Sequence, residues 1–357
     1  MLVPINIDFV TPLSVGNIVQ AATGKRILAN ASFHVLGSVG NALEGVEGSS
    51  IFNVQTDYVS GVQGAGVVNI VGGDAEWLQG AGVANIVSGH FHGAQGAGVF
   101  NIAAKGLSGV QGSGVANITG DAHGVQGAGV VNIAQELDGV QGAGVINIAK
   151  NVRGVQAAGV SNNAEDVAGL QAAGVLNTAR HVTGAQIGLI NIADNNEGVM
   201  LGLLNFSAAH GIHADLWTDE MRFVRLGLRT GNKNFYNLLA FGLQPFNGVT
   251  LWSIGYGAGT QVYLSQRDYI DISGLGEIVF EGANLRFWNF TTSIAHLRFL
   301  YGHEFTKNFA VFIGPTLNFS WERSSIPELF PGAWTLGSSP FQSNTRAWIG
   351  VSGGFRF

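Results

Sequence analysis

The sequence predicts an all-β protein in two parts: Gly-rich β-repeats, for which a β-solenoid is favoured, and then the strands of a transmembrane β-barrel. A ten-residue core such as GVQGAGVVNI recurs along the first part. Of 35 Phe, Trp and Tyr residues, three lie between 61 and 205 and 27 lie between 207 and 357. Long alternations of apolar with small or polar residues fill this second part. The predicted division is 1–44, N-terminal strands or a cap; 45–206, eleven repeats; and 207–357, barrel strands.

The composition excludes several classes of protein. Only 11% of the residues are charged, whereas a soluble globular domain carries about a quarter. Disordered chains are poor in apolar residues, and this one is 46% hydrophobic. The absence of cysteine removes disulfides and thiolate zinc sites. A net charge of -6 without a Lys/Arg cluster argues against a nucleic-acid partner.

The N-terminus and the apolar runs bear on export. The start, MLVPINIDFV, lacks a basic segment followed by an apolar one, so we expect no signal peptide in this chain. The apolar stretches lack the spacing and length of a spanning helix. We therefore expect a mature exported chain that has been given a start Met.

The repeats have a regular, slowly shortening period. An Asn recurs through all eleven copies, and the spacing between successive Asn residues falls from 16 to 15 to 14 residues. A Gln recurs six residues before most of them, with Glu47 and Met200 in its place at the two ends. The ten cores from Gly61 onward contain no charged residue, so the charges lie in short linkers. The cores are therefore expected to be buried or embedded in a membrane, and the linkers to be wet.

Two geometries fit a β-repeat of this length. In a solenoid each repeat is one coil, and a repeated Asn forms a ladder between coils. In the alternative, one large outer-membrane barrel of about 18 to 20 strands, each repeat is a wall strand. Gln186 and Asn191 are five residues apart and would point to opposite faces of a straight strand, which favours the solenoid. In that solenoid we place Asn inside and Gln on the wetter face.

The second part contains seven strands that alternate clearly. In 308–322, Ile313, Phe319 and Trp321 share one face, and small or polar residues take the other, as in a barrel with lipid outside and a polar lumen. The last strand, which ends at Phe357, repeats the pattern. The residues from Arg323 to Thr345 are expected to form a surface loop. The other strands are predicted at 221–229, 235–243, 251–264, 269–280 and 293–305.

An eighth strand is expected because bacterial single-chain barrels have even strand numbers. The first candidate is Asn284 to Phe290, and the substitute is Leu2 to Val10. If the substitute were correct, the repeats would more readily belong to the same barrel wall.

Two features resemble known outer-membrane proteins. The ending GGFRF, with terminal Phe357, resembles the C-terminal signal that the barrel assembly machinery of Gram-negative bacteria recognises. The repeats QIGLINI (186–192) and MLGLLNF (200–206) resemble those of the GLQIGLxNIA-type surface-repeat proteins of these bacteria. The same family is resembled by the junction between the two parts, DLWTDEMRF, and by the segments KNFYNLLAFG, IGYGAGTQ, WIGVSGGFRF and ASFHVLGSVGNALEGVEG. The resemblance therefore extends from Ala31 onward. Most copies here depart from that family by carrying Gly-Ala in place of Ile after Gln. The resemblance implies an outer-membrane location and no established activity.

Two groups of histidines are candidate metal ligands. His210, His213 and Asp215 lie together in HGIHAD, but their spacing matches no standard zinc or copper pattern, and a solvated hinge is the expectation. His90 and His92 could chelate from one strand face, but they lie in a linker.

The remaining candidates have structural explanations. The GxGxG of Gly255, Gly257 and Gly259 lies in a strand, whereas a phosphate loop needs a helix behind it. Asp271 and Glu277 could form a catalytic carboxylate pair but are as easily lumenal polarity. We expect Arg225, Arg229, Arg298 and Glu304 to fill a narrow lumen with paired charges. No catalytic, cofactor-binding or metal site is assigned.

These features favour a non-enzymatic integral outer-membrane protein whose repeats are a surface or scaffold element. The expected partners are outer-membrane lipid and, through the strand ending at Phe357, the barrel assembly machinery. The alternative is a pore for passive solute diffusion whose wall includes the repeats. A third hypothesis is an outer-membrane or periplasmic hydrolase.

Overall fold

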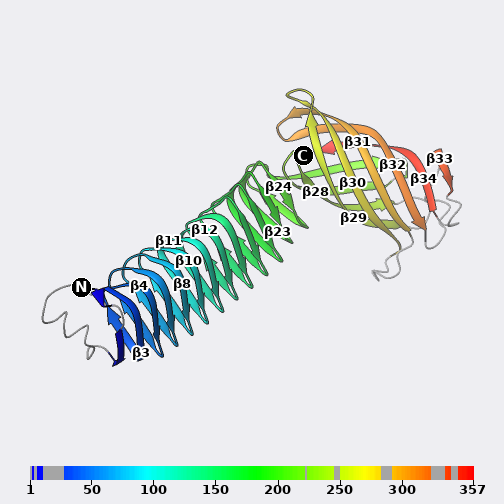
Figure 1. Ribbon diagram of the computed structural model, residues 1–357. Helices are drawn as coiled ribbons and strands as arrows, with labels where there is room; N and C mark the ends of the chain where they lie inside the picture. Colours follow the sequence, from blue (N-terminus) through cyan, green and yellow to red (C-terminus); the bar gives the residue numbers. More distant parts are fainter. Residues whose placement is uncertain are drawn as a thin grey trace. The chain divides into compact units, whose positions relative to one another are not determined.

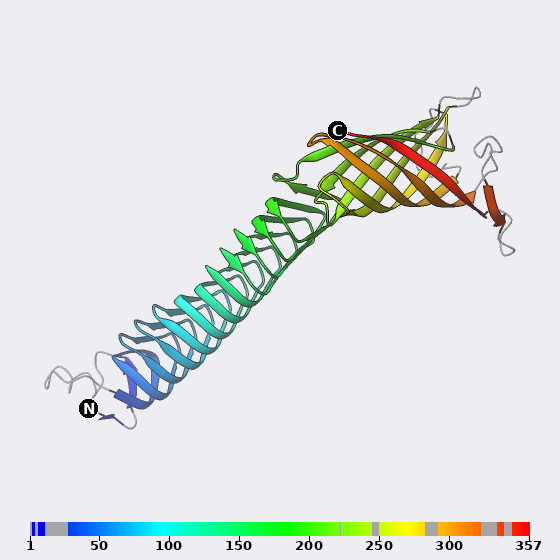
Figure 2. The same cartoon turned by 90° about the horizontal axis from the view of Figure 1, so that it is seen from above.

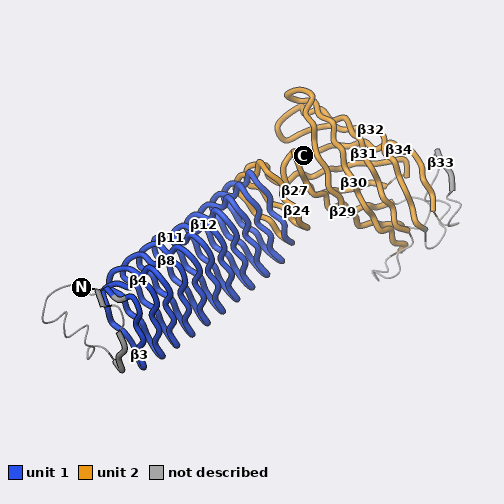
Figure 3. The backbone as a smooth tube through the Cα atoms, viewed as in Figure 1, with its two compact units in different colours: residues 1–189 blue, residues 190–357 orange. Residues whose placement is uncertain are grey.

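A computed structural model describes residues 2–3, 6–10, 28–221, 223–244, 250–282, 292–322, 334–338 and 345–357. The chain forms two compact units, 1–189 and 190–357 (Figure 3). Coils of about 15 residues form a parallel β-solenoid over 31–207, and an eight-stranded antiparallel β-barrel follows (Figure 1). The all-β prediction, with the solenoid favoured, is therefore confirmed. The part of the chain described here has no helix long and apolar enough to cross a membrane.

Each coil of the solenoid contributes strands to two faces, and the coils stack along its axis (Figure 2). The face that carries Gln contains β4 (Ala42–Ser49), β6 (Val59–Ala65), β8 (Ala75–Ala81), β10 (His90–Ala97), β14 (Glu136–Ala143), β17 (Val155–Ala158), β20 (Leu170–Ala173), β22 (Ala185–Ile187) and β24 (Val199–Leu201). The face that carries Asn contains β5 (Phe52–Gln55), β7 (Val68–Val71), β9 (Ala84–Val87), β13 (Val131–Ile133), β15 (Ile146–Ile148), β18 (Ser161–Asn163), β21 (Leu176–Val182), β23 (Ile190–Asn196) and β25 (Leu204–Ser207). Both faces share β3 (Leu28–Gly40), β11 (Phe100–Ser113) and β12 (Ala116–Ala128), and the linkers add β16 (Asn151–Val152) and β19 (Asp166–Val167).

The strand register places identical repeat positions directly above one another. Gln63 pairs with Gln79, one coil further along the chain, and Asn69 pairs with Asn85, in parallel strands. Bacterial membrane barrels instead pair antiparallel strands. The alternative of one large barrel with each repeat as a wall strand is therefore wrong, and so is the pore whose wall the repeats would complete.

The interior of the solenoid holds two columns of amides. From Gln111 to Gln186 and from Asn53 to Asn205 the repeat amides are fully buried. From Gln79 onward each repeat Gln donates to the Gln of the preceding coil, as Gln79 Nε2 does to Gln63 Oε1 over 2.7 Å. The prediction that Gln lies on the wetter face is wrong, because each Gln finds its hydrogen-bonding partner in the neighbouring coil and needs no water.

The linker side of the interior is apolar. Leu43, Val59, Val71, Phe91 and Leu107 belong to one buried cluster in the first coils. The coil interior thus combines an amide half with a hydrocarbon half.

Glycine is the first residue of most repeat cores, on the Gln-bearing face, because neighbouring coils approach closely there. Gly109, with φ 139°, pairs with Gly124 of the next coil. A Cβ added at Gly124 would lie 2.0 Å from the Gly109 carbonyl oxygen. Trp77 occupies the same repeat position with φ 87°, although a non-glycine residue in this region is strained.

The barrel is a closed antiparallel sheet. Its two terminal strands, β26 and β34, pair with each other, so it has no open edge there. The short β33 (Trp334–Ser338) adds to β34. The eight wall strands are β26 (Ile212–Asp219), β27 (Val224–Gly231), β28 (Tyr236–Gln244), β29 (Leu251–Tyr263), β30 (Asp268–Glu281), β31 (Thr292–Thr306), β32 (Phe309–Glu322) and β34 (Thr345–Arg356).

The seven strands that alternate clearly are confirmed, and the eighth is β26. The first candidate, Asn284 to Phe290, lies outside the described residues, as does most of the predicted loop from Arg323 to Thr345. The substitute, Leu2 to Val10, is wrong for the barrel. Its strands β1 (Leu2–Val3) and β2 (Asn6–Val10) pair in parallel with β3 of the solenoid.

The barrel wall separates apolar from polar side chains. Ile313, Phe319 and Trp321 are exposed on the outside, whereas Asn318 and Ser320, on the same strand, are buried in the lumen. The predicted alternation is confirmed on both C-terminal strands.

Candidate functional site in the barrel lumen

The first group of charges in the lumen surrounds Arg225 of β27. Its guanidinium meets the Glu277 carboxylate through two short contacts, Nε to Oε1 at 2.8 Å and Nη2 to Oε2 at 2.9 Å. Nη1 also donates to Asp219. His296 Nε2 lies 3.3 Å from Glu277 Oε2, and His296 Nδ1 lies 2.8 Å from Asn318 Oδ1. These groups come from five strands, β26, β27, β30, β31 and β32, and tie them together across the lumen.

The second group joins the two closing strands to the middle of the sheet. Arg229 contacts Asp271 at 2.9 Å and Asp215 at 3.0 Å. Arg356 Nε lies 2.8 Å from the other oxygen of Asp215. Tyr236 donates its hydroxyl to Asp271 at 2.5 Å. Asp215 and Asp271 thus each serve two arginines, with Arg356 Nη2 at 3.6 Å from Asp271.

Arg298 is buried without a polar partner. It is 2% exposed, and none of its three guanidinium nitrogens has a hydrogen-bond partner among the described residues. Its guanidinium instead lies 4.8 Å from the centre of the Trp217 ring, a cation–π arrangement. Cation and ring together occupy lumen space that water would otherwise fill.

One end of the wall carries a further carboxylate. Glu220, in the turn after β26, accepts from Trp348 Nε1 at 2.6 Å, Asn318 Nδ2 at 2.9 Å and the Val351 amide at 3.0 Å. It therefore links that turn to β32 and β34.

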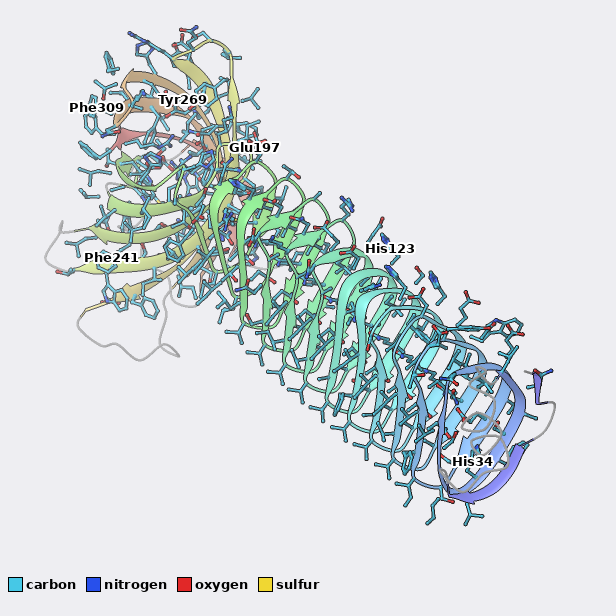
Figure 4. The ribbon with its side chains drawn as sticks, turned by 90° about the vertical axis from the view of Figure 1, so that its left-hand side faces the viewer. His34, His123, Glu197, Phe241, Tyr269 and Phe309 are labelled. Carbon is cyan, nitrogen blue, oxygen red and sulfur yellow. The ribbon has the colours of Figure 1, made fainter. Side chains whose placement is uncertain are left out.

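A small pocket opens beside the second group. Its volume is about 160 Å³, and its wall includes Arg229, Tyr236 and Arg356 together with Lys233 and His210. Burial, followed by the positive charge of Lys233, lowers the pKa of His210 below its usual value. Tyr269, labelled in Figure 4, lies near this group and accepts from Arg356 Nη1 at 3.0 Å. The pocket is a recess backed by Arg229 and Arg356, which both bind Asp215.

The predicted cluster of paired lumenal charges is borne out for Arg225 and Arg229, which are buried and bound to carboxylates. Arg298 is buried in the lumen but lies against an aromatic ring and not beside a carboxylate of the described residues, and the Glu304 carboxylate lies at the pocket and accepts from Tyr263. Asp271 and Glu277 are also buried there, each bound to a different arginine.

The sequence reasoning missed Asp219 and Glu220 and gave Arg356 no partner. These carboxylates lie in DLWTDEMRF, which shows too little apolar alternation to reveal a strand. The signal available was the position of Arg356, which alternation places on the lumen side of the last strand.

The histidine candidates do not form metal sites in the described part of the chain, where no three His, Cys, Asp or Glu residues are grouped to hold a metal. Asp215 is committed to two arginines, and His210 Nδ1 lies 3.0 Å from Ser207 Oγ. His90 and His92 stack on the outside of β10 with their ring centres 6.3 Å apart.

The GxGxG glycines make room for the lumenal groups. A Cβ at Gly259 would lie 2.4 Å from the Tyr236 hydroxyl, and one at Gly255 would lie 2.7 Å from Glu277 Cγ. Their role in β29 is steric.

No protein-family model matches the chain, and no curated protein matches it. The class is thus defined by architecture, a long parallel β-solenoid followed by a closed eight-stranded β-barrel.

Proposed function

We propose that this chain is a non-enzymatic integral outer-membrane protein whose barrel is a closed anchor and whose solenoid is a scaffold. The observation that carries the proposal is the side-chain distribution of the barrel. Its outside is apolar, as at Leu226, Ile313 and Val351, and its lumen is filled by ionic and aromatic groups. Surrounding hydrocarbon explains why apolar side chains face outward and polar ones face the lumen. Closure of the sheet also suits lipid, because a barrel with no open edge leaves no strand backbone unpaired there.

The closed lumen argues for an anchor over a channel. A barrel of eight strands has an interior just wide enough for side chains to fill. Here bidentate Arg225–Glu277 and the arginines shared by Asp215 and Asp271 cross that interior. Solutes would have to break desolvated ion pairs to pass.

Assembly would proceed through the last strand. Phe357 donates its backbone amide to Ala214 at 2.9 Å and accepts from it at 3.0 Å, at the seam that closes the barrel. Its side chain is exposed on the outside. A terminal aromatic in this position suits recognition by the barrel assembly machinery before closure.

The first test is expression of the full chain behind a cleavable signal peptide in a Gram-negative host. The protein should fractionate with outer membranes and migrate faster on gels before boiling than after it. Recovery in the soluble fraction, with no change of mobility on boiling, would refute membrane insertion.

The second test is conductance in planar bilayers. The native chain should give no stable current steps, because Arg225–Glu277 and the arginines shared by Asp215 and Asp271 cross its lumen. Stable large steps from the native chain would overturn the closed anchor.

A further inference from the structure

The outer surface of the solenoid is apolar wherever the repeat core runs. One row of valines follows the Ala-Gly or Ser-Gly of each core at the turn between the two faces, and its members are 37–44% exposed. We call this row the apolar edge. It consists of Val67, Val83, Val99, Val115, Val130, Val145, Val160 and Val175.

Further exposed apolar side chains flank that edge on both faces. Val110, Val125 and Val140 lie on the Gln-bearing face, and Ile118 and Ile148 on the Asn-bearing face. The cores from Gly61 onward hold no charged residue. The surface around the apolar edge is therefore uncharged in every coil of unit 1 from Gly61 onward.

The charges gather at the opposite end of each coil, in the linkers, which we call the charged edge. Figure 4 shows carbon-only side chains along one edge of the coils and nitrogen and oxygen tips along the other, where His123 is labelled. Pairs such as Arg153–Glu136 at 3.7 Å and Arg180–Glu165 at 3.5 Å join successive linkers there. The solenoid is thus amphipathic across its width.

The interior of each coil is polar behind the apolar surface. Behind the apolar surface lie the buried Gln and Asn columns, so the amides face inward and the hydrocarbon faces outward. A protein folded in water favours the reverse, because exposing apolar area to water is unfavourable. The same inversion distinguishes the barrel, with its polar lumen and apolar outside. Hydrocarbon as the surrounding medium accounts for both.

Trp77 provides an independent observation. It occupies a position where the neighbouring coils carry Gly61 and Gly93, adopts φ 87°, and is 68% exposed. Backbone strain of this kind is unfavourable, and residues that carry it concentrate at functional sites. Trp77 stands between Glu76 of the linker and Leu78 of the apolar surface. Tryptophan is enriched at this kind of boundary, where lipid headgroups meet hydrocarbon.

The depth of the apolar surface fits within one leaflet. From Val62 along β6 to Ala65 and through the turn to Val67 the chain advances five residues, which span at most about 16 Å at ~3.3 Å per residue. The hydrocarbon core of a bilayer is about 30 Å thick, so one leaflet provides about half of that. The backbone groups within this depth bond to the adjacent coils, as lipid requires.

From these observations we infer that the apolar edge is a lipid-binding surface, by which the solenoid inserts edgewise into one membrane leaflet. The valine row faces acyl chains, Trp77 lies at headgroup level, and the charged edge remains in water. The inference goes beyond the proposed barrel anchor, since it assigns a second membrane contact to the protein.

The absence of cysteine makes the chain suited to single-site labelling. A bimane fluorophore is attached at Val115→Cys or Val145→Cys on the apolar edge, and at Asp121→Cys or Lys150→Cys on the charged edge. Ile313→Cys reports on the barrel wall. The full-length variants are reconstituted in phosphatidylcholine–phosphatidylethanolamine vesicles that contain nitroxide-labelled lipid, and iodide serves as the aqueous quencher.

Labels on the apolar edge should be quenched several-fold more by nitroxide lipid than labels on the charged edge, with the opposite order for iodide. If iodide reaches the apolar edge while lipid quenches Ile313→Cys, the leaflet inference falls and the barrel anchor stands. If lipid fails to quench Ile313→Cys, the barrel anchor falls, and the edge labels still test the leaflet contact. An apolar edge shielded from both quenchers would overturn the lipid assignment in favour of a second copy of the chain.

Two variants test the chemistry of the surface. Val115→Asp combined with Val145→Asp should abolish lipid quenching of a label at Val130→Cys, while the outward positions leave the fold, followed by circular dichroism, unchanged. Trp77→Gly should raise the melting temperature by removing the strained backbone and should reduce lipid quenching at Val83→Cys. Unchanged lipid quenching in both variants would contradict the inference.

Discussion

The glutamine and asparagine side chains form two hydrogen-bonded columns along the solenoid axis. The donors of the two columns point in opposite directions along the chain. Gln141 Nε2 donates to Gln126 in the coil before it, whereas Asn132 Nδ2 donates to Asn147 in the coil after it. Asn also bonds the backbone of the next coil, as Asn132 does to the Gly142 carbonyl at 2.8 Å. The asparagine column therefore fastens the turn of each coil as well as its neighbour's amide.

At this scale, Asn132→Ala should destabilise the solenoid by about 1–3 kcal/mol because it leaves buried amide and carbonyl groups unpaired. Gln126→Ala should cost less, since Gln126 bonds only to Gln111 and Gln141 among the contacts described. Both side chains are fully buried, so the expected difference comes from the number of hydrogen bonds lost and not from a difference in burial. Denaturant melts of both variants measure the difference, and equal losses would contradict it.

The glutamine column ends at a carboxylate. Glu47 Oε2 accepts from Gln63 at 2.8 Å, and Oε1 accepts from Ser38 at 2.6 Å and Gln55 at 2.8 Å. An acceptor-only group suits an end of the column where every neighbour donates.

Glu47→Gln should therefore lower the unfolding free energy, on the order of 1–3 kcal/mol, because its new NH₂ group would oppose a donor. The exposed linker change Glu76→Gln is the matched control and should leave stability almost unaltered. A melt in which the two variants behave alike would refute this account of the column end.

At the scale of elements, the barrel depends on contacts between strands distant in sequence. Arg225 of β27 and Glu277 of β30 are both fully buried. Removing one member of such a pair leaves an isolated charge, which costs about 3–5 kcal/mol.

Arg225→Met should thus sharply lower the urea midpoint of the detergent-solubilised barrel, followed by loss of the fast-migrating unheated band. The double variant Arg225→Met with Glu277→Met should recover part of the loss, because it removes the fully buried Glu277 charge that the single variant leaves without its arginine. A double variant weaker than the single one would contradict this charge argument.

The seam between β26 and β34 gives a prediction for assembly. Deleting Phe357 removes an exposed aromatic and the backbone pair with Ala214, whereas Phe355→Leu keeps an apolar group facing outward. The deletion should therefore reduce the folded, heat-modifiable fraction in outer membranes more than Phe355→Leu does. Equal surface levels of the two proteins would count against a terminal assembly signal.

At the scale of the whole molecule, the second unit begins before the barrel strands. Asn232 Nδ2 donates to the carbonyls of Asn196 at 2.9 Å and Gly198 at 3.0 Å, and the Tyr256 hydroxyl donates to Gly202 at 2.7 Å. The segment 190–207 is thus part of the same compact unit as the barrel.

A chain of residues 190–357 should consequently fold in detergent into a heat-modifiable barrel. A chain of residues 208–357 should lose its fast-migrating form at a temperature lower by about 5 °C or more, given about 1 kcal/mol for each hydrogen bond lost. Identical transition temperatures would show that these contacts add nothing to barrel stability.

Patterns confined to the chain predicted most of this architecture. The Asn spacing and the five-residue step from Gln186 to Asn191 favoured stacked coils, and alternation placed Ile313 outside and Asn318 inside. The burial of Gln was missed because its partner lies a full coil away. Strand β26 was missed because Asp215 becomes an inward strand residue only through Arg229 and Arg356, which are remote in sequence.

The register of identical residues between coils also has a genetic consequence. From Gly109 to Thr183 each coil presents to the next the same strand register and the same Gln and Asn side chains that it receives from the coil before. An in-frame duplication or loss of about 45 base pairs, one coil, would leave every amide and backbone partner in place and change the length by about 4.8 Å. Recombination between repeats can therefore change the length of the solenoid without a new interface between coils having to evolve.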